Sequence, residues 1–271
     1  MMDWVDKIKK WFGRGDDQKS LPEQTILVTI LLAKESMPDA EAVDRALAAS
    51  LPREVVESAV EDRGGLQRVR VLGGEIHWTV LPVCIADTDA ARAVQGSGHW
   101  RRAKPAVAGH QAHLLVYARG SKLRRVALAD LVSRVVAVLV PTLPAVAVLW
   151  NDASLLHDPE SFRQLASSSS PERLPVPLWI AVAILAREGE PHLVITRGLE
   201  AFGLMEIEAS VKAKKPEAAW DLVAGTAHHL LLSGPVLEDG HTVGGDDGDR
   251  NVVQHRSSEL DAQRQVYRLE L

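Results

Sequence analysis

The chain has 271 residues, 46% of them hydrophobic and 25% charged, which is the composition of a globular protein with a sizeable core. Its formal net charge of -5 argues against nucleic acid as the main partner, because phosphate contacts need a basic face. The single cysteine, Cys84, excludes an internal disulfide. Its apolar neighbours predict a buried side chain, and we expect a reducing cytoplasm.

The first twelve residues predict a short amphipathic helix. At about 100° per residue, its apolar side chains share one arc about 120° wide. These stripe residues are Met1, Trp4, Val5, Ile8, Trp11 and Phe12. A polar tether follows at residues 13–20. Because so short a helix is marginal alone in water, it needs a surface to cover its stripe. We therefore expect a docking helix and tether at residues 1–20 and a folded body at residues 21–271.

The first part of the body predicts a strand, a helix and two further strands. The strand lies at residues 25–32, and Pro38-Asp39-Ala40-Glu41 opens a helix that runs to about Leu51. Gly73-Gly74 joins the next two strands in a hairpin. Residues 87–109 show no clear periodicity, and a loop there divides the body into two halves, 21–105 and 106–271.

The second half alternates single helices with groups of strands. Expected strands lie at residues 112–117, 145–150, 178–185, 192–196, 204–211, 251–255 and 266–271, and helices at 123–140, 159–166 and 216–232. Asp158 and Pro159 start the second of these helices. Trp220 is expected to face inward from the third, with Val223, Ala227 and Leu230. This order favours an α+β fold, with mainly antiparallel sheets and helices packed on them.

Four polar residues surround a glycine-rich turn near residue 200: Arg197, Glu200, Glu206 and Glu208. Glu206 and Glu208 are two positions apart on an expected strand and therefore point to the same face. Such a pair can bind a cation or share a proton. The alternative is an exposed strand face on which Arg197 pairs with a carboxylate.

The richest polar loop spans residues 239–249 and contains Asp239, His241 and Asp246. These side chains can hold a hard cation, but the spacing of a calcium-binding hand is absent. We therefore favour a solvated connection. No zinc-ligand spacing appears elsewhere, so we expect no cofactor and assign no catalytic residue.

Several clusters in the second half form a recurrent pattern: Leu149-Trp150 with Ser154, Leu156-His157, Pro159-Glu160-Ser161-Phe162, Leu178-Trp179, residues 196–208 and residues 239–244. This pattern resembles a bacterial domain of unknown function, family four-two-six-one, over about residues 110–271. The resemblance implies no activity and gives no residue a catalytic role. The N-terminal stripe is not part of the pattern.

Together these features predict a non-enzymatic cytoplasmic binding protein. Its stripe, above all Trp4, Val5, Ile8, Trp11 and Phe12, would enter the apolar groove of a larger protein assembly, with the body as cargo, adaptor or immunity-type module.

Three alternatives remain open. The stripe can lie on an anionic membrane surface, with Lys7, Lys9, Lys10 and Arg14 near the lipid headgroups. It can also pack on its own body. The third alternative is a metal-assisted hydrolase built from Glu206, Glu208, His241 and Asp246.

Overall fold

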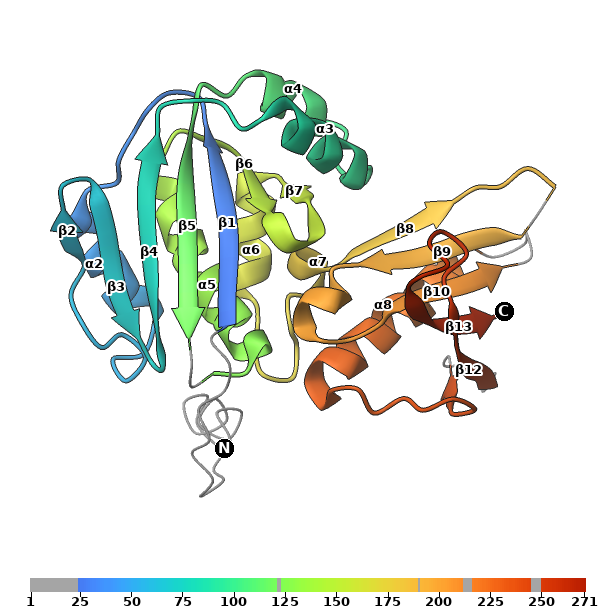
Figure 1. The fold of residues 1–271 in the computed structure, drawn as a ribbon. Helices are drawn as coiled ribbons and strands as arrows, with labels where there is room; N and C mark the ends of the chain where they lie inside the picture. The colour runs from blue at the N-terminus through green and yellow to red at the C-terminus, as the bar shows by residue number, and fades with distance from the viewer. Residues whose placement is uncertain (1–23, 121–122, 190, 212–215, 245–249) are drawn as a thin grey trace. The chain divides into compact units, whose positions relative to one another are not determined.

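The computed structural model describes residues 24–120, 123–189, 191–211, 216–244 and 250–271 (Figure 1). These residues form two mostly antiparallel sheets with helices packed on them, which confirms the predicted α+β class. The chain divides into two compact units, Met1–Leu178 and Trp179–Leu271, each with its own sheet. None of the described helices is long and apolar enough to cross a membrane.

The first unit is built on a seven-stranded sheet in the order β2-β3-β4-β5-β1-β6-β7. Its strands are β1 (Gln24–Leu32), β2 (Glu61–Arg63), β3 (Leu66–Val71), β4 (Gly74–Leu81), β5 (Ala112–Gly120), β6 (Ala145–Trp150) and β7 (Leu155–His157). β1 lies between β5 and β6, and β4 pairs with β5. Strands from both predicted halves, 21–105 and 106–271, therefore share one sheet.

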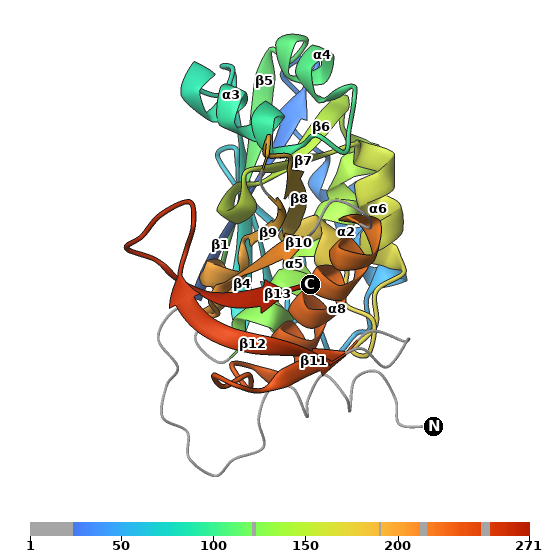
Figure 2. The ribbon, with the colours of Figure 1, turned by 90° about the vertical axis from the view of Figure 1, so that its right-hand side faces the viewer.

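Helices pack on both faces of this sheet, and those on one face, α3 and α4, lie at one end of it. The helices are α2 (Ala40–Ser50), α3 (Asp87–Gly96), α4 (Ala103–Ala108), α5 (Arg125–Leu139), α6 (Pro159–Ser167) and α7 (Val176–Trp179), with 3-10 turns η1 (Val140–Thr142) and η2 (Asn151–Ala153). In Figure 2, α2 and α6 lie to the right of the strands and α3 to their left. α3 and α4 pack Ala93, Ala103 and Val107 against Leu31 and Leu149 of the sheet.

Polar side chains inside the core fix the position of α2. Trp78 of β4 donates its indole N–H to Gln67 Oε1 at 2.7 Å, and Gln67 Nε2 donates to the Pro38 carbonyl oxygen at 2.9 Å. Both side chains are buried. Asp39 caps α2 by accepting from the Ala42 N–H at 2.8 Å, so the helix begins at Ala40 rather than at Pro38.

The Gly73-Gly74 hairpin is confirmed, and the neighbouring strand explains the second glycine. An added Cβ at Gly74 would lie 2.6 Å from the Arg119 carbonyl oxygen of β5. Only glycine therefore allows β5 to approach so closely. The predicted start of α6 is confirmed as well, because Asp158 Oδ2 accepts from the Ser161 N–H at 3.0 Å and Pro159 is the first helical residue.

One expectation for the first unit is wrong. The thiol of Cys84 is exposed, because residues 82–86 leave the sheet after β4, and it donates to the His110 carbonyl oxygen at 3.2 Å. The expected loop within residues 87–109 lies between two short helices, α3 and α4, which the sequence pattern did not predict.

The second unit has a six-stranded sheet in the order β11-β12-β13-β10-β9-β8. Its strands are β8 (Ala181–Leu185), β9 (His192–Arg197), β10 (Glu206–Val211), β11 (Thr242–Gly244), β12 (Arg250–Ser257) and β13 (Gln265–Glu270). One helix, α8 (Pro216–Ser233), and the 3-10 turn η3 (Leu199–Phe202) complete the described elements. The strand expected at residues 178–185 is shorter, because α7 occupies its first two residues.

α8 packs on the sheet with Val223, Ala227 and Leu230, all fully buried as expected. Trp220 departs from this pattern, since 38% of its surface is exposed. Its indole N–H donates to the Val182 carbonyl oxygen of β8 at 3.4 Å. Trp220 therefore lies beside the outermost strand rather than in the core.

Candidate functional site

The residues predicted to bind a partner through the N-terminal stripe lie outside the described part of the chain. This applies to Trp4, Val5, Ile8, Trp11 and Phe12, and equally to the lipid-contact alternatives Lys7, Lys9, Lys10 and Arg14. Asp246 of the polar loop also lies outside the described residues. The geometry below therefore concerns the remaining predicted polar residues and the surface of the first unit.

Glu206 is buried and holds the glycine-rich turn together. Its Oε1 accepts the backbone N–H of Gly198 at 2.7 Å and that of Glu200 at 3.2 Å. Its Oε2 accepts the Thr196 hydroxyl at 2.6 Å. Burial raises the pKa of Glu206, although these hydrogen bonds act in the opposite direction. Gly198 has a φ of 120°, which a residue with a Cβ rarely adopts.

Glu208 is engaged by a different set of partners, all near the C-terminal end of the chain. Arg268 Nη2 of β13 donates to Glu208 Oε2 at 2.7 Å, and the Glu259 backbone N–H donates to the same oxygen at 3.0 Å. The Ser258 hydroxyl donates to Glu208 Oε1. Arg268 also pairs with the Glu259 carboxylate. Glu208 and Arg268 are both buried, so this is an internal ion pair.

The two carboxylates therefore neither lie on an exposed face nor share a common partner. They are two residues apart on β10, as expected, but the turn after β9 engages Glu206 and the loop after β12 engages Glu208. Both neighbouring segments supply N–H or O–H donors to these carboxylates. The arrangement fits structural anchoring of two loops better than binding of one cation between them.

The other predicted polar residues also anchor loops. Glu200 pairs with Arg264 at 3.5 Å, and Arg197 is half-buried at the end of β9. Asp239 Oδ1 accepts the His255 backbone N–H of β12 at 2.6 Å. His241 Nδ1 accepts the Glu238 N–H at 3.2 Å. Within the described ranges, no three His, Cys, Asp or Glu side chains are placed to hold a metal ion.

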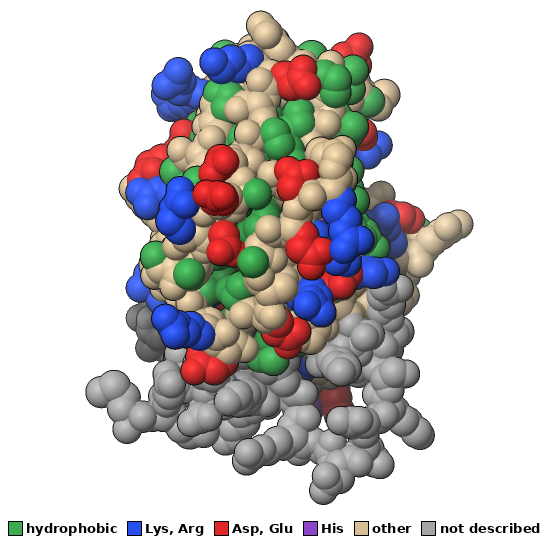
Figure 3. Space-filling model, turned by 90° about the vertical axis from the view of Figure 1, so that its left-hand side faces the viewer, with side chains coloured by type: hydrophobic (Ala, Val, Ile, Leu, Met, Phe, Trp, Pro, Cys, Tyr) green, Lys and Arg blue, Asp and Glu red, His purple; other side chains and the backbone are tan. Residues whose placement is uncertain are grey.

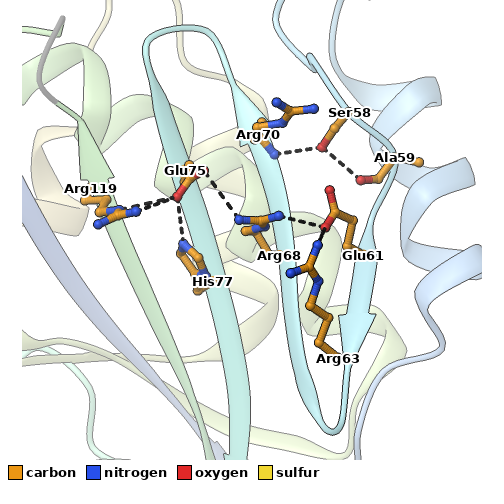
Figure 4. Close-up of polar contacts among 9 residues, drawn as sticks. All are labelled: Ser58, Ala59, Glu61, Arg63, Arg68, Arg70, Glu75, His77 and Arg119. Carbon is orange, nitrogen blue, oxygen red and sulfur yellow. Dashed lines mark hydrogen bonds and ion pairs between the residues drawn. The ribbon is translucent and has the colours of Figure 1, made fainter.

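A charged ladder on the first sheet is a feature that sequence analysis missed. Arg68 Nη2 of β3 bonds Glu61 Oε2 of β2 at 2.7 Å, and Arg119 Nη2 of β5 bonds Glu75 Oε2 of β4 at 2.9 Å (Figure 4). Arg68 Nη1 lies 3.7 Å from Glu75 Oε1 and links the two pairs. The hydrogen bond from Arg68 lowers the pKa of Glu61, and that from Arg119 lowers the pKa of Glu75.

The ladder lies at one end of the sheet face that α2 and α5 leave open. Cross-strand register places two leucines in a row with a threonine on the same face: Leu66 of β3 lies opposite Thr79, and Thr79 lies opposite Leu115 of β5. Leu66 is exposed. Figure 3 shows that acidic and basic side chains are interspersed over the side of this unit formed by β2, β3 and α2. The ladder therefore presents paired charges of both signs, which suit a polar partner of mixed charge rather than an anion.

Part of the ladder has a signal in the sequence. A hairpin turn at Gly73-Gly74 sets the register that places Arg70 opposite Glu75 and Arg68 opposite His77. Arg119 has no such signal, because it is 44 residues from Glu75 and only the pairing of β4 with β5 brings it close.

A buried histidine links β7 to the end of the first unit. His157 Nε2 lies 3.1 Å from the Leu178 carbonyl oxygen, and its ring centroid is 5.8 Å from that of His99. Burial lowers the pKa of His157 to about 4, and the nearby His99 acts in the same direction. Burial also lowers the pKa of His99. The His157 ring is therefore neutral in the folded protein at neutral pH.

We expect His157 to make stability depend on pH. An unfolded histidine has a pKa of about 6.5, so between that value and about 4 the unfolded chain binds more protons than the folded chain. His157 should thus contribute about 3 kcal/mol of stability at neutral pH, lost as the pH falls through this window. Urea unfolding across the window measures this loss. His157→Gln, which keeps a donor for Leu178 but does not titrate, should show a shallower decline, with His99 supplying part of the remainder. Equal declines in both proteins would contradict the assignment.

A comparison with protein families finds a match in the C-terminal part of the chain. Residues 195–270 match the model of a family described as a domain of unknown function (DUF4261). No curated protein and no solved structure matches the chain. The matched range begins in β9 and ends in β13, so it contains Glu206, Glu208 and the loop at Asp239. The clusters at residues 149–162 and 178–179 precede it. The matching family is the one that the resemblance names, and the match covers the last part of the predicted range, residues 195–270.

Proposed function

We propose that this chain is a non-enzymatic binding protein, recruited to a larger protein assembly through the apolar stripe of residues 1–12. The observation that carries the proposal is the extensive pairing of β1, the first strand after this segment. β1 pairs with β5 along all nine residues from Gln24 to Leu32, and with β6 from Val28 onward. A partner that holds the stripe would thus be tied through residues 13–23 to an inner strand of a seven-stranded sheet.

The chemistry of the stripe suits an apolar groove in a protein. In a helix over residues 1–12, two tryptophans and a phenylalanine would share one arc with Ile8 and Val5. Large aromatic side chains seated in pockets dominate the binding energy of helix-in-groove interfaces. The body would be delivered as cargo, adaptor or immunity-type module. The proposed setting is the cytoplasm of a bacterium, consistent with a single cysteine in the chain.

The test compares three full-length proteins: wild type, Trp4→Ala/Trp11→Ala, and Lys7→Ala/Lys10→Ala as the control with the stripe intact. The partner is identified by affinity purification from the native host, produced in pure form, and titrated by calorimetry. Each tryptophan should contribute about 2 kcal/mol, so each replacement should weaken binding about 30-fold. The lysine variant should bind nearly as tightly as wild type, with little dependence on salt.

Two results would contradict recruitment by a protein. If the chain binds anionic lipid vesicles, and the lysine variant or added salt abolishes that binding, the stripe serves a membrane surface. If the double tryptophan variant instead lowers the thermal stability of the isolated protein, the stripe packs on its own body.

A further inference from the structure

The two sheets end in four outer strands, and three of these have features that prevent pairing with another chain. β2 has three residues, Glu61, Asp62 and Arg63, all charged. β11 also has only three residues, and β7 is three residues long and buried. Short length, charge and burial are the usual protections of a sheet edge. The remaining outer strand, β8, has five residues, Ala-Val-Ala-Ile-Leu, with no charge and no proline.

β8 also exposes apolar surface, and Trp220 extends it. Ile184 is 42% exposed and Ala183 is exposed as well. The Trp220 indole lies beside the strand, where it donates to the Val182 carbonyl oxygen at 3.4 Å, a long and therefore weak hydrogen bond that a pairing strand would have to displace. We call Val182, Ala183, Ile184 and Trp220 the β8 edge patch. Figure 1 shows β8 as the outermost strand of the second sheet.

We propose that the β8 edge patch is the interface of a homodimer, in which β8 pairs antiparallel with β8 of a second copy and joins two six-stranded sheets. The proposal is independent of the function of the N-terminal stripe. It assigns a self-association surface to the part of the chain from Trp179 onward.

The sequence of β8 favours a second copy over a different strand as the occupant. A two-fold axis through Ala183 places Val182 opposite Ile184 of the other copy, and Ala181 opposite Leu185. Every pair is then apolar, and no like charges face one another. The exposed Ile184 side chain then has Val182 of the other copy beside it on the same face of the sheet, because directly opposed residues of an antiparallel pair point to the same face. An unrelated strand would find no charge or polar side chain on β8 to select it.

The small size of the interface predicts a reversible dimer. A standard stable interface buries about 800 Å² on each partner, more than a pair of five-residue strands and two indole rings supplies. The dimer should therefore dissociate on dilution, and its formation should depend on protein concentration.

Sedimentation velocity over a wide dilution series of the full chain tests this. The mean mass of wild type should rise from the chain mass of 29.5 kDa toward twice that value as concentration increases. Ile184→Lys should stay monomeric throughout, because a charged side chain on an edge strand opposes pairing. Val252→Lys is the matched control: Val252 is 47% exposed on β12, which already has a partner strand on each side. It should dimerise as wild type does, and circular dichroism checks that both variants fold.

A cross-linking experiment tests the register. In a Cys84→Ser background, Ala183→Cys places one thiol per chain on the proposed two-fold axis. Because Trp220 bonds the Val182 carbonyl on the free edge, the backbone groups of the next residue, Ala183, point toward β9. Ala183 would therefore oppose its copy in a non-hydrogen-bonded pair, with Cα atoms about 4.5 Å apart, within the range of a disulfide. Mild oxidation should therefore convert this variant to a covalent dimer much faster than Val252→Cys in the same background.

Three results would overturn the proposal. The first is a wild-type mass that stays at one chain at every concentration. The second is a dimer that persists in Ile184→Lys. The third is a dimer that disappears in Trp4→Ala/Trp11→Ala, which would place the interface in the N-terminal stripe. Recruitment of a partner is measured separately, so failure of one proposal does not decide the other.

Discussion

Replacing Arg268 with alanine should lower the free energy of unfolding by about 3–5 kcal/mol, the usual cost of removing one partner from a buried ion pair. Arg268 Nη2 donates to Glu208 Oε2 at 2.7 Å, and both side chains are buried. The substitution leaves the Glu208 carboxylate with only the Ser258 hydroxyl and the Glu259 N–H as donors. Guanidinium chloride unfolding followed by circular dichroism measures the change.

Two controls separate the buried charge from other effects of the substitution. Arg264 belongs to the same unit and pairs with Glu200 and Asp261 on the surface, so Arg264→Ala should cost no more than about 1 kcal/mol. The double variant Glu208→Gln/Arg268→Met removes both charges and keeps an acceptor for the Glu259 N–H. It should recover most of the stability that Arg268→Ala loses. Equal losses of unfolding free energy in Arg268→Ala and Arg264→Ala would show that the Glu208–Arg268 pair behaves like a surface ion pair.

Replacing Trp78 with alanine should cost a similar amount in the first unit, about 3–5 kcal/mol, because it empties a large volume in the core. Trp78 is fully buried on β4, and its indole N–H is the donor to Gln67 Oε1. Gln67 in turn holds the Pro38 carbonyl just before α2. The loss therefore combines a cavity with a broken link between sheet and helix. Urea unfolding at neutral pH measures it.

A milder variant divides this cost into its two parts. Trp78→Phe fills most of the volume but leaves Gln67 Oε1 without its donor, which should cost about 1–3 kcal/mol. Tyr117→Ala is the surface control, since Tyr117 is exposed on the opposite face of the same sheet and should change stability by less than about 1 kcal/mol. Equal stabilities of Trp78→Phe and wild type would show that water replaces the indole at Gln67.

Sequence signals that depend on neighbouring residues predicted the fold well. The hairpin at Gly73-Gly74 and the helix start at Asp158-Pro159 are both present, because each rests on backbone geometry that a few residues fix. α3 and α4 escaped prediction for the opposite reason. They are short, and contacts with Leu31 and Leu149, distant in sequence, define their packed face.

The candidate polar site shows the same limit. The two-residue spacing correctly placed Glu206 and Glu208 on one strand, but it held no information about their partners. Ser258 and Arg268 lie 50 and 60 residues from Glu208. Trp220 was misplaced because helical periodicity identifies an apolar arc but not where the covering sheet ends. At Trp220 the sheet has already reached its last strand, β8.

The central place of β1 has a consequence for how the chain is made. β1 is translated before both of its neighbours in the sheet, β5 and β6, and the Thr29 hydroxyl donates to Asn151, 122 residues later. Contacts between residues so far apart in sequence slow folding, because the intervening chain must be ordered before they form. During synthesis both edges of β1 stay unpaired until most of the first unit has been translated. Nascent chains of this protein should therefore depend on chaperones until β6 emerges.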